Sequence, residues 1–83
     1  MTIADERILE FLHEESPRQP KQIADGLAEM GLEFNDKYIG RRCLELAKFG
    51  LLRNLGNGIY MVTDLGEDYL SGELNANELE PQD

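Results

Sequence analysis

Two short runs of β-favouring residues, 51–55 and 59–62, interrupt a sequence that otherwise follows a helical pattern. Gly56, Asn57 and Gly58 separate the two runs, and an Asn-Gly step in this position is a strong β-hairpin signal. The sequence therefore predicts a single hairpin, with a short turn, within a mainly helical chain.

Apolar residues recur at helical spacing in the segments on either side of the hairpin. We expect helices at 3–15, from Pro20 to about Gly31, at 35–49 and from Thr63 to about Gly72. Thr2, Asn35 and Thr63 are candidate N-caps, because their side-chain oxygens can accept hydrogen bonds from the free N–H groups of a first turn. The residues expected on the inward helix faces are Ala4, Ile8, Phe11, Leu12, Ile23, Leu27, Met30, Ile39, Cys43, Leu46 and Ala47.

Residues 32–34 are too few for a helix and are expected to form a brief strand. The predicted order is therefore helix, helix, short strand, helix, hairpin, helix, which is the layout of a winged helix-turn-helix domain. A chain of 83 residues has room for one core. We assign that domain to residues 1–74 and an acidic C-terminal tail to residues 75–83.

The composition is strongly acidic, with 17 Asp and Glu against eight Lys and Arg and a net charge of -9. Such a surface suits very high salt, because carboxylates hold water and cations. We therefore favour adaptation to a salt-rich cell, with an acidic domain that binds basic partners as the alternative.

Several classes of protein are not indicated by the sequence. It has no glycine-rich phosphate loop, no metal-ligand cluster and no nucleophile beside its one histidine, so we expect no enzyme, cofactor or metal site. No apolar run is long enough to span a membrane. The single cysteine, Cys43, excludes an internal disulfide, and a cytoplasmic location is expected.

The charge is unevenly distributed along the chain. Residues 37–62 hold five basic residues and one acid, Glu45, for a net charge of +4, whereas the rest of the chain has a net charge of -13. The positive window covers the third helix and the hairpin. These are the two elements that a winged helix presents to the major groove and the neighbouring DNA backbone.

The candidate DNA contacts in this window are Lys37, Tyr38, Arg41, Arg42, Arg53 and Asn57. Arg41 points away from the predicted core in the first half of its helix, where it could pair with guanine through two hydrogen bonds. Arg42 lies towards the flank of the helix, where a phosphate contact and an internal ion pair both fit. Arg53 and Asn57, on the short hairpin, could touch the backbone or the minor groove.

Three other residues have competing interpretations. His13 is expected to be a surface residue that interacts with the end of the first helix, because a cation is favourable there. Cys43 is expected in the core. Leu44 falls towards the exposed side of the third helix, and it could pack under the hairpin, contact a thymine methyl group or contact a partner chain.

A set of short segments carries a resemblance to a known family: Arg41-Arg42-Cys43-Leu44-Glu45-Leu46-Ala47-Lys48-Phe49-Gly50-Leu51-Leu52, Gly58-Ile59-Tyr60, Thr63-Asp64-Leu65-Gly66 and Tyr69-Leu70. Through them the chain resembles the haloarchaeal winged-helix proteins related to the halophage phi-H repressor, from about Ala4 to Leu74. The resemblance implies a phage-repressor-like DNA-binding regulator in a high-salt cytoplasm, which acts as a homodimer on a two-part operator.

The expected function is therefore that of a sequence-specific regulator of transcription, a repressor that reads the major groove of double-stranded DNA with helix 35–49. The alternative is a winged-helix protein-interaction adaptor without DNA binding, because a net charge of -9 would repel DNA at low salt. No pocket-forming insertion supports an effector-sensing regulator, so no small-molecule ligand is expected.

Overall fold

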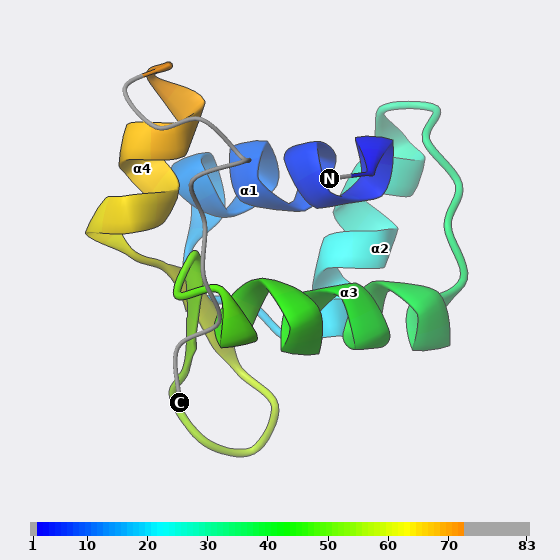
Figure 1. Ribbon diagram of the computed structural model, residues 1–83. Coiled ribbons are helices and arrows are strands. Elements are labelled where there is room, and N and C mark those ends of the chain that lie inside the picture. The colour runs from blue at the N-terminus through cyan, green and yellow to red at the C-terminus, as the bar shows by residue number, and fades with distance from the viewer. Residues whose placement is uncertain (1, 73–83) are drawn as a thin grey trace.

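The computed structural model describes residues 2–72, so the predicted acidic tail at 75–83 lies outside the described residues. The elements are α1 (Ile3–Glu15), α2 (Pro20–Glu29), α3 (Asp36–Lys48), β1 (Leu52–Asn54), β2 (Tyr60–Val62) and α4 (Asp64–Leu70). In Figure 1, α1 and α3 run one above the other, α2 crosses beside them, and α4 packs near the end of α1. The hairpin projects at the C-terminal end of α3.

The predicted helix starts are confirmed by their caps. Thr2 and Asp5 form a capping box, in which each side chain accepts a hydrogen bond from the other residue's backbone N–H at 3.1 Å. Asn35 accepts a hydrogen bond from the Lys37 N–H at 2.8 Å, and Thr63 accepts one from the Gly66 N–H at 3.1 Å. Each cap satisfies backbone donors that the first turn of a helix leaves free.

One core joins the helices to the hairpin. Its buried residues are Ile8, Leu9, Phe11, Leu12, Ile23, Ala24, Leu27, Ile39, Cys43, Leu46, Leu51, Leu52 and Tyr60. Cys43 is fully buried, as predicted, and burial raises the pKa of its thiol to about 12. The thiolate is therefore not formed at neutral pH, and Cys43 acts as a small apolar side chain.

The brief strand predicted at residues 32–34 is wrong. These residues belong to no helix or strand, and the Leu32 N–H instead donates to the Leu27 carbonyl and closes the end of α2. Strand β2 also pairs with the connection between α1 and α2. Arg18 in this connection and Tyr60 in β2 exchange two backbone hydrogen bonds of 3.0 and 2.9 Å. This pairing brings together residues that are far apart in the sequence, which no local pattern reveals.

Met30 is also placed differently from the prediction, because its side chain is 61% exposed. It is the C-cap of α2, and the chain reverses at Gly31, whose φ is 84°. The helical spacing that aligns Met30 with Ile23 and Leu27 therefore ends just before it, and its side chain leaves the core.

The hairpin follows the prediction. Strands β1 and β2 are antiparallel with Leu52 opposite Val62, and the Leu55 N–H extends the ladder by donating to the Ile59 carbonyl at 2.7 Å. Asn57 and Gly58 have φ values of 54° and 72° at the tip. Two successive positive φ angles are the feature that favours Asn-Gly in tight hairpin turns.

Gly66 in α4 lies where the helix touches the hairpin. A Cβ atom at this position would lie 2.5 Å from the Leu51 carbonyl oxygen and 2.7 Å from Val62 Cγ2. We expect Gly66→Ala to lower the free energy of unfolding by about 1–3 kcal/mol, because the backbone must shift to relieve this overlap. Gly40→Ala is the matched control, because its Cβ would meet only Pro20 at 3.9 Å or beyond. Urea denaturation of both variants checks the prediction, and equal stability of the two would contradict it.

Candidate nucleic-acid interface

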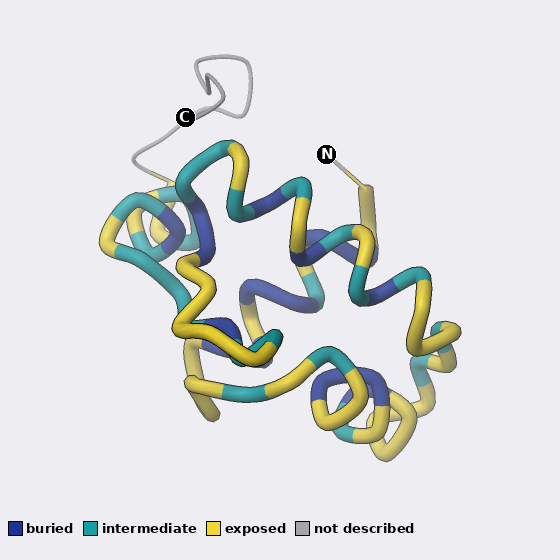
Figure 2. Tube along the Cα trace, turned by 90° about the horizontal axis from the view of Figure 1, so that it is seen from below, coloured by how far each residue is buried: buried dark blue, intermediate teal, exposed yellow. Residues whose placement is uncertain are grey.

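One face of α3 is open to solvent along its whole length. Lys37, Arg41, Leu44 and Lys48 are all exposed, and their spacing of four, three and four residues places them in one stripe on the helix. Ile39, Cys43 and Leu46 are buried on the opposite face. Figure 2, seen from the side of α3, shows buried and exposed residues alternating along the helices. We call this row of four exposed residues the α3 stripe.

Arg41 is supported by an aromatic pair at the start of the stripe. The rings of Phe34 and Tyr38 stack with their centroids 6.2 Å apart, and the Arg41 guanidinium carbon lies 6.0 Å from the Tyr38 centroid. A guanidinium over a tyrosine face gains a cation–π attraction. The structure therefore brings together two predicted site residues, with the half-buried Tyr38 placed to hold Arg41 in position.

Arg42 forms the internal ion pair that was one of its two predicted roles. Its Nε and Nη2 atoms donate to Asp5 Oδ1 and Oδ2 at 2.7 and 2.8 Å. Asp5 is 1% exposed, and the Arg42 side chain is 28% exposed. This bidentate ion pair joins the start of α1 to the middle of α3 and fixes which side of α3 faces the core.

Burial by itself raises the pKa of Asp5, but the hydrogen bonds from Arg42 and Thr2 outweigh burial, and the pKa is lowered. The hydrogen bond to Asp5 in turn raises the pKa of Arg42. Both groups are therefore charged at neutral pH. In the sequence, Asp5 follows Thr2 at the spacing of a capping box, and no local pattern indicates that it would meet Arg42.

The remaining candidates are exposed but lie apart from the start of the stripe. Arg53 is in β1 and Asn57 is in the turn, and both are exposed on the hairpin beyond the C-terminal end of α3 (Figure 1). Lys48, at that end of the stripe, lies 3.3 Å from Glu45, with both side chains solvent-accessible. Such an exposed pair is weak and leaves Lys48 available to another anion.

His13 and Leu44 are both exposed. His13 lies in the last turn of α1, as predicted, and its Nδ1 is 2.6 Å from Glu67 Oε2, so it also connects α1 to α4. Leu44 is 53% exposed. It is therefore not buried under the hairpin, and a contact of Leu44 with a thymine methyl group or with a partner chain stays a prediction.

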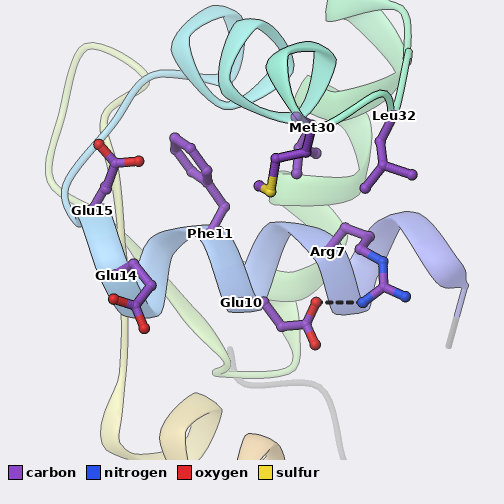
Figure 3. Close-up of a pocket in the computed structure, with 8 residues that line it drawn as sticks. Arg7, Glu10, Phe11, Glu14, Glu15, Met30 and Leu32 are labelled. Atoms are coloured by element: carbon purple, nitrogen blue, oxygen red, sulfur yellow. Dashed lines mark hydrogen bonds and ion pairs between the residues drawn. The ribbon is translucent and has the colours of Figure 1, made fainter.

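A separate groove lies between α1 and the end of α2 (Figure 3). Phe11, Met30 and Leu32 line it together with Glu14 and Glu15. Its lining residues belong to α1, α2 and the segment after α2, so it lies outside the α3 stripe. Within residues 2–72 no group of His, Cys, Asp or Glu is arranged to hold a metal ion.

The turn from α2 to α3, the outward face of α3 and the hairpin that follows it define a winged helix-turn-helix protein. Residues 1–82 match the family of winged helix-turn-helix phage repressors, and the chain belongs to this family. It is a family of repressor-type regulators and not an enzyme class. No helix in the described part of the chain has the length and apolar character needed to cross a bilayer.

Two individual proteins are similar to this chain over nearly its whole length. The repressor protein of Halobacterium phage phiH is 32% identical, in an alignment that covers 96% of this chain and 90% of that protein. The crystal structure of the PhiH1 repressor-like protein from Haloarcula marismortui is 39% identical and superimposes with a TM-score of 0.86, covering 99% of this chain and 90% of the other. The haloarchaeal winged-helix resemblance and the fold class are thereby confirmed.

Proposed function

We propose that the chain is a sequence-specific, double-stranded DNA-binding transcriptional repressor whose domain, residues 1–74, reads the major groove with helix 35–49. The observation that carries the proposal is the α3 stripe, with Lys37, Arg41 and Lys48 exposed on one helix face of a chain whose net charge is -9. Membership of the phage repressor family supports the same function.

Each candidate residue has a distinct role in this proposal. Arg41, held against Tyr38, donates two hydrogen bonds to a guanine edge, and Lys37 neutralises a phosphate. Arg53 and Asn57 on the hairpin contact the backbone beside the groove. Arg42 acts by holding α3 in place, because both of its described hydrogen bonds go to Asp5.

The chain acts as a homodimer that covers a promoter or operator in a salt-rich archaeal cytoplasm. A two-fold dimer of helix-turn-helix domains contacts two half-sites about one helical turn apart, so the operator is expected to contain two related halves. The organisms of the two similar proteins, a Halobacterium phage and Haloarcula marismortui, support the high-salt setting.

High salt changes which contacts provide the affinity. Counterion release drives DNA binding at low salt, but it contributes little when the bulk salt is already molar. Base contacts, buried area and hydration must then supply a larger share. The short hairpin and the few cations of the α3 stripe fit a protein that depends on base contacts more than on charge.

Selection from a pool of random duplexes at molar KCl tests the proposal. The full chain should enrich one sequence with two related half-sites, and the enriched duplex should shift in a gel while a scrambled duplex of the same composition does not. Recovery of the pool without any enriched sequence would contradict the proposal and favour an adaptor that binds protein.

A further inference from the structure

Leu44 lies in the α3 stripe between two cations. It is 53% exposed, three residues after Arg41 and four residues before Lys48, so the three side chains follow one another along the outer face of the helix. The depression beside it is lined by Tyr38, Arg42 and Glu45 in addition to these three residues. A large apolar side chain therefore stands in the middle of the face that the proposed function assigns to DNA.

We propose that Leu44 packs against the C5-methyl group of a thymine and selects that base at one position of each half-site. This inference rests on the proposed function and adds a specificity-determining residue to it. A leucine side chain cannot hydrogen-bond to a base edge or a phosphate. The thymine methyl is the distinctive apolar group that base pairs present in the major groove, so it is the partner that such a side chain can recognise.

The charges around Leu44 favour DNA over a protein partner. A protein that covered Leu44 would also have to cover Arg41 and Lys48, and burying a cation without a partner is costly. DNA offers both kinds of contact at once, because phosphates and a guanine edge satisfy the cations while a thymine methyl meets the leucine.

The neighbours of Leu44 also indicate where the thymine should lie. Arg41 is one helical turn towards the N-terminus of α3, and residues three apart on a helix contact adjacent parts of the same surface. The selected thymine should therefore be close to the guanine that Arg41 recognises.

The test uses the duplex that the chain enriches and removes one methyl group at a time by replacing single thymidines with deoxyuridine. The wild-type chain should lose about three- to fivefold in affinity at one thymine of each half-site, the effect of returning one methyl group to water. Leu44→Ala should bind the thymidine and deoxyuridine duplexes equally at that position, and circular dichroism should show an unchanged fold because the side chain is exposed.

Leu55→Ala is the matched control, because Leu55 is a 49% exposed leucine on the hairpin. This variant should keep the wild-type preference for thymine. Equal wild-type affinity for thymidine and deoxyuridine at every position would overturn the inference, as would an unchanged preference in Leu44→Ala. A lower mass of Leu44→Ala in sedimentation, with its thymine preference intact, would assign Leu44 to a chain–chain contact instead. If no duplex is enriched at all, the proposed function itself fails, and the inference fails with it.

Discussion

Arg42→Ala is expected to lower the free energy of unfolding by about 3–5 kcal/mol, because it leaves a buried carboxylate without its charged partner. Asp5 is 1% exposed and receives two hydrogen bonds from Arg42. Asp5→Ala should lower the free energy of unfolding by a smaller amount, because the Arg42 side chain that it leaves without a partner is 28% exposed and can turn towards water. Arg42→Lys should fall between wild type and Arg42→Ala, since an ammonium group keeps the charge but not the planar fork.

Urea denaturation at pH 7 and constant KCl measures these differences. Glu10→Ala is the control, because it breaks the exposed Arg7–Glu10 pair and should change stability by less than about 1 kcal/mol. If Arg42→Ala were no more destabilising than Glu10→Ala, the pair between α1 and α3 would not be the connection that the structure indicates.

The pH dependence of the same variants follows from the lowered pKa of Asp5. Its ordinary value is 3.8, so the stabilising effect of the ion pair is complete above that pH and is lost as the pH falls through the lower pKa of the folded protein. In Arg42→Ala the Asp5 carboxylate remains buried without its charged partner. Protonation of this carboxylate in acid removes the free-energy cost of burying its charge. The difference in stability between wild type and Arg42→Ala should therefore narrow in acid, and a constant difference down to pH 3 would contradict this account.

Local chemistry explains why most of the fold could be predicted. Thr2, Asn35 and Thr63 cap helices through hydrogen bonds to residues two or three positions away, and Asn57 and Gly58 set the turn through their own backbone angles. The errors concern contacts that local chemistry does not determine. Arg18 pairs with Tyr60 across 42 positions of sequence, and residues 32–34 form no strand although their composition favours one.

In the candidate site, too, local sequence predicts which residues are exposed but not which residues they contact. Helical spacing places Lys37 and Arg41 on the exposed face, and the structure agrees. The same spacing leaves two roles open for Arg42, because its partner Asp5 is 37 residues away and no local pattern links the two residues. For Leu44 the spacing left three contacts open, and only its exposure removes one of them. The DNA contacts of Arg53 and Asn57 remain predictions.

Arg41→Ala is expected to weaken binding to the enriched duplex by about 1–3 kcal/mol, or roughly 5- to 160-fold, because two hydrogen bonds to a guanine are lost. The loss should disappear on a duplex in which that guanine is replaced. Lys37→Ala should weaken binding to all duplexes by a smaller factor at molar KCl, because phosphate contacts contribute little there. It should also lower the slope of the logarithm of affinity against the logarithm of salt concentration by about one. The two variants therefore separate base recognition from phosphate contact within one helix turn.

A mobility shift of the enriched duplex at molar KCl, with Arg41→Ala beside Arg7→Ala, tests most directly whether the α3 stripe faces DNA. Arg7→Ala removes the same charge from α1, where Arg7 is paired with Glu10 and lies outside the stripe. We expect Arg41→Ala to lose affinity at least fivefold and Arg7→Ala to bind like wild type, both with unchanged circular dichroism. Wild-type affinity in Arg41→Ala, or an equal loss in both variants, would contradict this expectation.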